Sequence, residues 1–123
     1  MLDKKIVIVD DDEAIRKTFF LLLSSRYNVY LARDAREALA RFEKAPVDMI
    51  IADFRLPQKN GLQMLFDFRQ AGYQGKIILI SAYPDQIKRD ELEKLGVDRV
   101  FLKPLDLKAL TEAIDGLLAG PAS

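Results

Sequence analysis

Four short runs of consecutive apolar residues constrain this chain more than any other feature of its sequence. They are Ile6–Val9, Met49–Ala52, Ile77–Ile80 and Val100–Leu102. Each run is continuous rather than alternating in polarity, which is typical of strands in a parallel sheet that helices cover on both faces. A weaker run, Val29–Ala32, predicts a fifth strand at an edge. The sequence therefore predicts a chain that folds around one five-stranded sheet.

The segments between these runs carry apolar residues at helical spacing. This spacing predicts five helices, over residues 15–23, 35–42, 62–71, 84–95 and 107–117. Strand and helix alternate five times without an internal linker, which predicts a single α/β domain with right-handed crossovers. We expect that domain to cover residues 1–119, with residues 120–123 as a tail or the start of a removed linker.

The composition limits the chemistry that the chain can perform. It contains neither cysteine nor histidine, so it lacks disulfides, the commonest general base and the commonest transition-metal ligand. Its 19 basic and 19 acidic residues give a formal net charge of zero, which argues against direct nucleic-acid binding by this domain. The sequence has no signal-peptide pattern and no apolar stretch long enough to span a bilayer, so we expect a cytoplasmic protein without membrane contact.

Polar residues follow four of the five predicted strands. These residues are Asp10 and Asp11 after the first run, Asp53 after the third, Ser81 after the fourth and Lys103 after the last. In an open parallel sheet, ligands bind beyond the carboxyl ends of the strands, near the point where the strand order reverses. If the order is 2-1-3-4-5, Asp10, Asp11 and Asp53 converge in one acidic pocket. Ser81 and Lys103 then lie on its far side.

This set of side chains favours phosphoryl chemistry assisted by a metal ion. Crowded carboxylates are costly without a cation, and Mg²⁺ prefers oxygen ligands such as carboxylates and phosphate. An aspartate can attack phosphorus and form an aspartyl phosphate. Lys103 would add a second positive contact, and the Ser81 hydroxyl would donate a hydrogen bond to the attached group.

Four motifs occur in order along the chain. They are Ile6–Asp12 (IVIVDDD), Asp53–Pro57 (DFRLP) with Asn60-Gly61, Ser81-Ala82 and Lys103-Pro104. Together they resemble the receiver domains of bacterial two-component response regulators, over about residues 4–118. The resemblance implies a flavodoxin-like three-layer α/β/α sandwich with a five-stranded parallel sheet of order 2-1-3-4-5 and five helices. It also implies a signalling phosphoprotein that catalyses its own phosphorylation and dephosphorylation, and not an enzyme with a separate substrate.

The resemblance assigns a role to each residue that matches a motif. Asp53 matches the phosphoacceptor, Ser81 the switch hydroxyl and Lys103 the lysine at the phosphoryl group, with a cis peptide bond to Pro104. The Mg²⁺ ligands that it implies are Asp10, Asp11, Asp53 and the backbone carbonyl of Arg55.

The resemblance also implies partners. A histidine kinase or a histidine phosphotransfer protein would supply the phosphoryl group. The fourth predicted helix has few apolar residues between Ile87 and Leu95, which indicates a mobile element. Together with the fifth strand and fifth helix it would form the face that contacts an output domain or partner, or a second copy in a phosphorylation-dependent homodimer.

The sequence departs from the commonest family pattern at two positions. Val100 stands where a switch aromatic is usual, and Leu105 replaces a frequent phenylalanine after Lys-Pro. Phe101 is expected to face the opposite side of its strand. We therefore expect a switch that depends on movement of loops and of the fourth helix.

Three further side chains carry separate expectations. We expect Asp12 to cap the first helix and not to bind metal. Arg55 and Tyr83 are bulky residues close to the predicted site, and we expect them to shield an acyl phosphate from water.

Two other functions fit parts of the pattern. A haloacid-dehalogenase-type phosphatase would use Asp10 as its nucleophile in the Asp-x-Asp motif Asp10–Asp12, but the usual Thr or Val after that motif and the later acid pair are absent. A receiver-like interaction module would undergo no Mg²⁺-dependent modification, which fits poorly with the complete set of acids.

Overall fold

The structure, a computed structural model, describes residues 3–119, so the predicted tail at 120–123 lies outside the described residues. Its sheet has the spatial order β2-β1-β3-β4-β5, and every neighbouring pair of strands is parallel. In chain order the strands are β1 (Lys5–Val9), β2 (Asn28–Ala32), β3 (Met49–Asp53), β4 (Lys76–Ser81) and β5 (Arg99–Leu102). The predicted strands, their order and the position of the second strand at an edge are confirmed.

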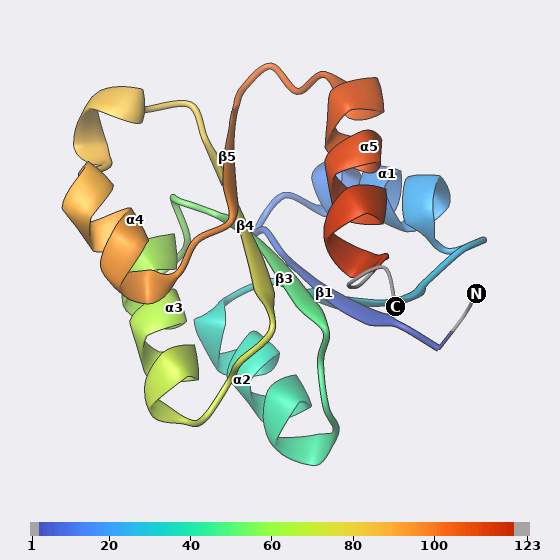
Figure 1. Ribbon diagram of the computed structural model, residues 1–123, viewed down its shortest axis with the longest axis horizontal. Coiled ribbons are helices and arrows are strands. Elements are labelled where there is room, and N and C mark those ends of the chain that lie inside the picture. Colours follow the sequence, from blue (N-terminus) through green and yellow to red (C-terminus); the bar gives the residue numbers. More distant parts are fainter. Residues whose placement is uncertain (1–2, 120–123) are drawn as a thin grey trace.

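Helices cover both faces of the sheet, as Figure 1 shows, with α1 and α5 on one face and α2, α3 and α4 on the other. They are α1 (Glu13–Leu23), α2 (Ala35–Lys44), α3 (Gly61–Gln70), α4 (Arg89–Leu95) and α5 (Leu107–Leu118). The flavodoxin-like three-layer sandwich is therefore confirmed. Within residues 3–119, none of these helices combines the length and apolarity that crossing a membrane requires.

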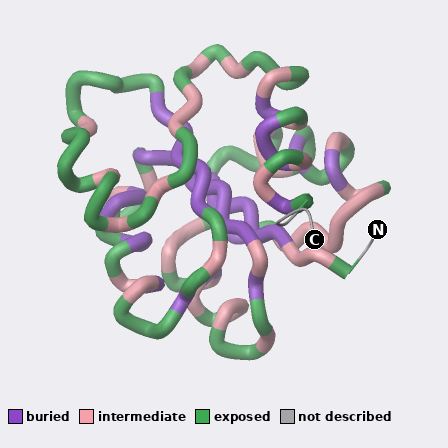
Figure 2. The backbone as a smooth tube through the Cα atoms, viewed as in Figure 1, coloured by how far each residue is buried: buried purple, intermediate pink, exposed green. Residues whose placement is uncertain are grey.

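Two apolar cores hold the layers together, one on each face of the sheet. Successive strand residues point to opposite faces, so each continuous run feeds both cores. Val7 and Ile50 pack with α2 and α3, whereas Ile8 and Ile51 pack with α1 and α5. All five residues of β3 are buried, and Figure 2 shows the buried strands at the centre of the molecule. The central strands therefore present their carboxyl ends from a rigid core.

The fourth helix is shorter than the sequence predicts. We expected a helix from near Pro84, but the chain forms a 3₁₀ turn, η1 (Pro84–Gln86), and α4 begins only at Arg89. Ile87 and Lys88 are extended between them, and Ile87 packs against the core from that conformation. Neither η1 nor α4 contains a fully buried residue, so little apolar packing favours one continuous helix.

The loop between β3 and α3 contains a strained residue. Gln58 is exposed and has φ of 69°, in the left-handed region that only glycine adopts at low cost. We expect Gln58→Gly to raise the free energy of unfolding by about 0.5–1 kcal/mol, because the relieved strain exceeds the added entropy of the unfolded chain. Urea unfolding measures this change. Gln74→Gly is the matched control, an exposed loop position without positive φ, and should lower stability; a loss at both positions would contradict the prediction.

Candidate functional site

The carboxyl ends of β1 and β3 bring three carboxylates together. Val9 pairs with Ala52 in the register of the two strands, so Asp10 and Asp53 follow side by side. Carboxylate oxygens of Asp10, Asp11 and Asp53 all lie within 4.8 Å of one another. Asp10 is 3% exposed and Asp53 6% exposed, whereas Asp11 is exposed. The predicted acidic pocket is therefore present, with two acids inside it and one at its rim.

The electrostatics of this pocket favour a cation. Burial raises the pKa of Asp10 to about 6, and the charge of Asp53 adds to the rise. A hydrogen bond from the Asp12 backbone N–H and the charge of Lys103 act in the opposite direction. Mg²⁺ prefers oxygen ligands such as carboxylates, so this cluster of carboxylate oxygens fits that ion.

Lys103 supplies the positive charge at the pocket. Its Nζ donates a hydrogen bond to Asp53 Oδ2 at 2.9 Å, and its backbone N–H donates to the Ser81 carbonyl at 2.9 Å. The Lys103–Pro104 peptide bond is cis. Burial lowers the pKa of Lys103, but its hydrogen bond to Asp53 and the surrounding carboxylate charges together raise this pKa above its ordinary value. Lys103 is therefore protonated beside Asp53.

Ser81 ends β4 and is fully buried. Its Oγ accepts a hydrogen bond from the Tyr83 backbone N–H at 2.8 Å. No hydrogen bond joins it to Asp53 within residues 3–119. An Oγ that accepts a bond keeps its own proton free, so Ser81 retains a donor for a group attached nearby.

Arg55 lies in the loop after β3 and contacts Asp53 through its backbone. Its backbone N–H donates to Asp53 Oδ1 at 3.2 Å. Its guanidinium lies 4.2 Å from the centre of the Tyr83 ring and donates to Gln86 Oε1 at 3.3 Å. The two bulky side chains for which we predicted a shielding role are therefore in contact with each other.

The same loop contains two residues whose roles were not recognised in the sequence. Asn60 caps α3 in a reciprocal capping box with Gln63, a pattern that Asn-x-x-Gln before an apolar run could have revealed. A Cβ on Gly61 would lie 2.6 Å from the Asp53 backbone oxygen, so only glycine fits there without displacing backbone. Both residues fix the loop that follows Asp53.

The remaining sequence expectations at this edge concern Asp12, Val100 and Phe101. Asp12 caps α1 as predicted, since its Oδ1 accepts from the Ala14 backbone N–H at 2.9 Å. Val100 packs with the core of α2, α3 and α4, and Phe101 packs with the core of α1 and α5. The two β5 residues therefore face opposite sides of the sheet, as predicted.

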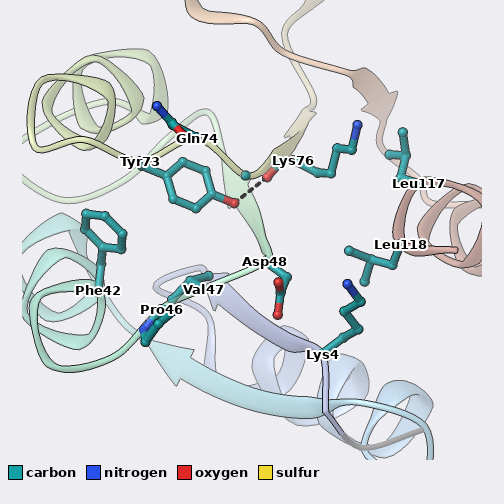
Figure 3. A pocket seen from close by; sticks show the side chains of 11 residues that line it. Lys4, Phe42, Pro46, Val47, Asp48, Tyr73, Gln74, Lys76, Leu117 and Leu118 are labelled. Carbon is teal, nitrogen blue, oxygen red and sulfur yellow. Dashed lines mark hydrogen bonds between the residues drawn. The ribbon is translucent and has the colours of Figure 1, made fainter. Parts of the chain in front are cut away.

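A separate pocket lies at the amino-terminal ends of β1, β3 and β4, and Figure 3 shows its lining. Its volume is about 370 Å³, with apolar walls that include Phe42, Val47 and Leu118. The Tyr73 hydroxyl donates to the Lys76 carbonyl at 2.8 Å, and the Asp48 carboxylate accepts from the Lys5 backbone N–H at 2.8 Å. These two polar groups thus bind the backbone. Asp10, Asp53 and Lys103 lie at the other end of the strands.

Comparison with known proteins points to one family. The family model of the response regulator receiver domain matches residues 6–115. The response regulator RR06 of Streptococcus pneumoniae is 29% identical over 114 residues, which are 92% of this chain and 52% of that protein. The chain spans about half the length of this and several other curated relatives.

Solved structures agree with this match. The signal receiver domain of an HD domain-containing protein from Pseudomonas fluorescens has a TM-score of 0.86 at 30% identity, covering 94% of this chain and 87% of that chain. The response regulator protein TrrA from Thermotoga maritima, solved in complex with Mg²⁺-BeF, has a TM-score of 0.80 at 30% identity, covering 94% and 99% of the two chains.

Proposed function

This chain belongs to the family of response regulator receiver domains of two-component systems, and on that premise we propose that Asp53 is its phosphoacceptor. The phosphoryl donor is a phosphohistidine on a histidine kinase or a histidine phosphotransfer protein. The observation that carries the proposal is the buried Asp53 carboxylate, which lies within 4.8 Å of the Asp10 and Asp11 carboxylates and 2.9 Å from the Lys103 ammonium.

The transfer exchanges one bond for another. A carboxylate oxygen of Asp53 attacks phosphorus, the P–O bond forms, and the P–N bond to the donor imidazole breaks with its electron pair leaving on nitrogen. Lys103 stabilises the negative charge on the phosphoryl oxygens. Asp10, Asp11, Asp53 and the Arg55 carbonyl would hold Mg²⁺, which neutralises charge on those oxygens when bound. Hydrolysis of the aspartyl phosphate by water then resets the site, so the domain catalyses both steps on itself.

The attached group then biases the conformation of the domain. The Ser81 hydroxyl donates to a phosphoryl oxygen, which draws in the backbone around Tyr83 that Ser81 already contacts. The neighbouring η1 and α4 contain no fully buried residue, so they rearrange at low cost. We place the output surface on α4, β5 and α5, for contact with an output domain or partner, or for a phosphorylation-dependent homodimer.

Several wider features belong to the same proposal. The receiver domain covers residues 1–119 and acts in the cytoplasm. TrrA, which is similar to this chain, was solved in complex with Mg²⁺-BeF, and this supports Mg²⁺ binding by this chain. Against a dehalogenase-type phosphatase, the Asp12 carboxylate is engaged in capping α1 and does not complete an Asp-x-Asp pair.

The chemical nature of the product tests this function. After incubation with acetyl phosphate and Mg²⁺, we expect a protein-bound ³¹P signal of an acyl phosphate that hydroxylamine removes. A signal that resists hydroxylamine would indicate a phosphoester and would contradict an aspartyl phosphate. No protein-bound signal would favour the interaction module that is never modified.

The contact between Arg55 and Tyr83 predicts a slow loss of phosphate. The guanidinium lies 4.2 Å from the centre of the ring, and the Arg55 backbone N–H donates a hydrogen bond to Asp53. The two side chains together therefore restrict the approach of water to the acyl phosphate. We expect the variant with both residues replaced by alanine to lose phosphate about tenfold faster, equivalent to 1.4 kcal/mol in the barrier to hydrolysis. Intact mass after removal of the donor follows the decay. Arg89→Ala, at an exposed arginine in α4, is the control; an unchanged lifetime in the double variant would refute the shield.

A further inference from the structure

The acidic turn after β1 is held in place by three hydrogen bonds. The Asp10 backbone N–H donates to the Ala32 carbonyl at 3.1 Å, and Asp10 Oδ1 accepts from the Asp12 backbone N–H at 2.9 Å. The third bond comes from a side chain that the proposed mechanism does not use. Arg16 Nη1 donates to the Asp10 carbonyl oxygen at 2.7 Å.

Arg16 connects α1 to the turn through one backbone and one side-chain hydrogen bond. Its backbone N–H donates to the Asp12 carbonyl at 3.1 Å, as part of the first turn of the helix. Its side chain reaches back six residues to Asp10. Asp10 directly follows Val9, the last residue of β1 that pairs with the neighbouring strands. The charged donor therefore satisfies a carbonyl just beyond the strand ladder, in a partly buried and short contact.

The Arg16 guanidinium binds a backbone carbonyl and not a carboxylate. None of the ion pairs within residues 3–119 involves Arg16. The guanidinium thus holds the peptide unit between Asp10 and Asp11 without occupying either carboxylate. Displacement of that peptide unit would carry both side chains with it, because the unit joins the Cα atoms of Asp10 and Asp11.

We infer that Arg16 is a positioning residue for the metal ligands, because it fixes the backbone that carries Asp10 and Asp11. This inference rests on the proposed function, since it assumes that Asp10 and Asp11 bind the ion. The contact uses a single N–H, so a lysine at this position can replace it in part, unlike at a site that needs the two-pronged geometry of arginine.

Calorimetric titration of the protein with Mg²⁺ tests the inference on four proteins: wild type, Arg16→Ala, Arg16→Lys and Arg26→Ala. Partners that orient metal ligands typically contribute tenfold or more to affinity, so we expect Arg16→Ala to raise the Kd for Mg²⁺ about tenfold. Arg16→Lys should recover part of this loss. At saturating Mg²⁺, the rate of phosphorylation by acetyl phosphate should return close to that of wild type in both variants.

Arg26→Ala is the matched control. Arg26 also makes a short guanidinium bond near α1, to Asp115 Oδ2 at 2.6 Å, but it lies away from the acidic turn. Its loss should leave Mg²⁺ affinity unchanged. An unchanged Kd in Arg16→Ala would overturn the inference, and so would an equal loss in both alanine variants, which would indicate general destabilisation. If wild type binds no Mg²⁺, the proposed function itself fails and the inference falls with it.

Discussion

Replacement of Lys103 by methionine should slow phosphorylation by acetyl phosphate by about 10²–10³-fold, the loss typical of removing one preorganised donor from a developing oxyanion. The ammonium lies 2.9 Å from Asp53 Oδ2, in a partly buried position where water replaces it poorly. Methionine keeps most of the apolar stem and removes the ammonium, with its charge and its hydrogen-bond donors. The measurement is the rate of appearance of the phosphorylated species at saturating Mg²⁺.

Lys108→Met provides the matched control for this substitution. Lys108 lies on α5 and is exposed, so the same change of chemistry there should leave the rate unchanged. Equal rates in wild type and Lys103→Met would show that the ammonium has no part in the transfer. Equal losses in both lysine variants would trace the effect to overall charge.

Replacement of Phe68 by alanine should lower the free energy of unfolding by about 3–5 kcal/mol. The ring is fully buried on α3, with its centre 5.5 Å from that of Phe42 and 5.8 Å from that of Tyr73. Its removal leaves a cavity beside the Phe42 and Tyr73 rings and loses the edge-to-face contact with Tyr73. Urea unfolding followed by circular dichroism gives the change.

Phe66→Ala is a strict comparison, because Phe66 is the same residue type on the same helix and is 54% exposed. We expect a change of less than about 1 kcal/mol there. Phe68→Leu keeps part of the apolar volume and should fall between the two. Similar losses in both alanine variants would contradict the packing of α3 described here.

The fold was predictable from the sequence because its strands are encoded locally. Continuous runs such as Ile77–Ile80 are apolar on both faces, and this requires a sheet with helices on both sides. The fourth helix was predicted too long. Its first residues carry a helix-compatible pattern, but Ile87 gains its packing in an extended conformation that no local spacing reveals.

The candidate site was predictable to a similar degree and for a related reason. Parallel neighbours have their carboxyl ends side by side, so acids at these ends, such as Asp10 and Asp53, meet once the strand order is known. Contacts made by long side chains could not be inferred in this way. The bond from Arg16 to the Asp10 carbonyl depends on the angle at which α1 leaves the sheet, and the pair of Arg55 and Tyr83 depends on two loop conformations.

Intact mass after incubation with acetyl phosphate, with and without Mg²⁺, tests the central claim most directly. Wild type, Asp53→Asn and Asp10→Asn are compared. The account predicts one phosphoryl adduct on wild type that requires Mg²⁺, is absent from Asp53→Asn, and forms more slowly on Asp10→Asn, which lacks one proposed metal ligand. An adduct that persists in Asp53→Asn but disappears in Asp10→Asn would contradict the account and would favour Asp10 as nucleophile.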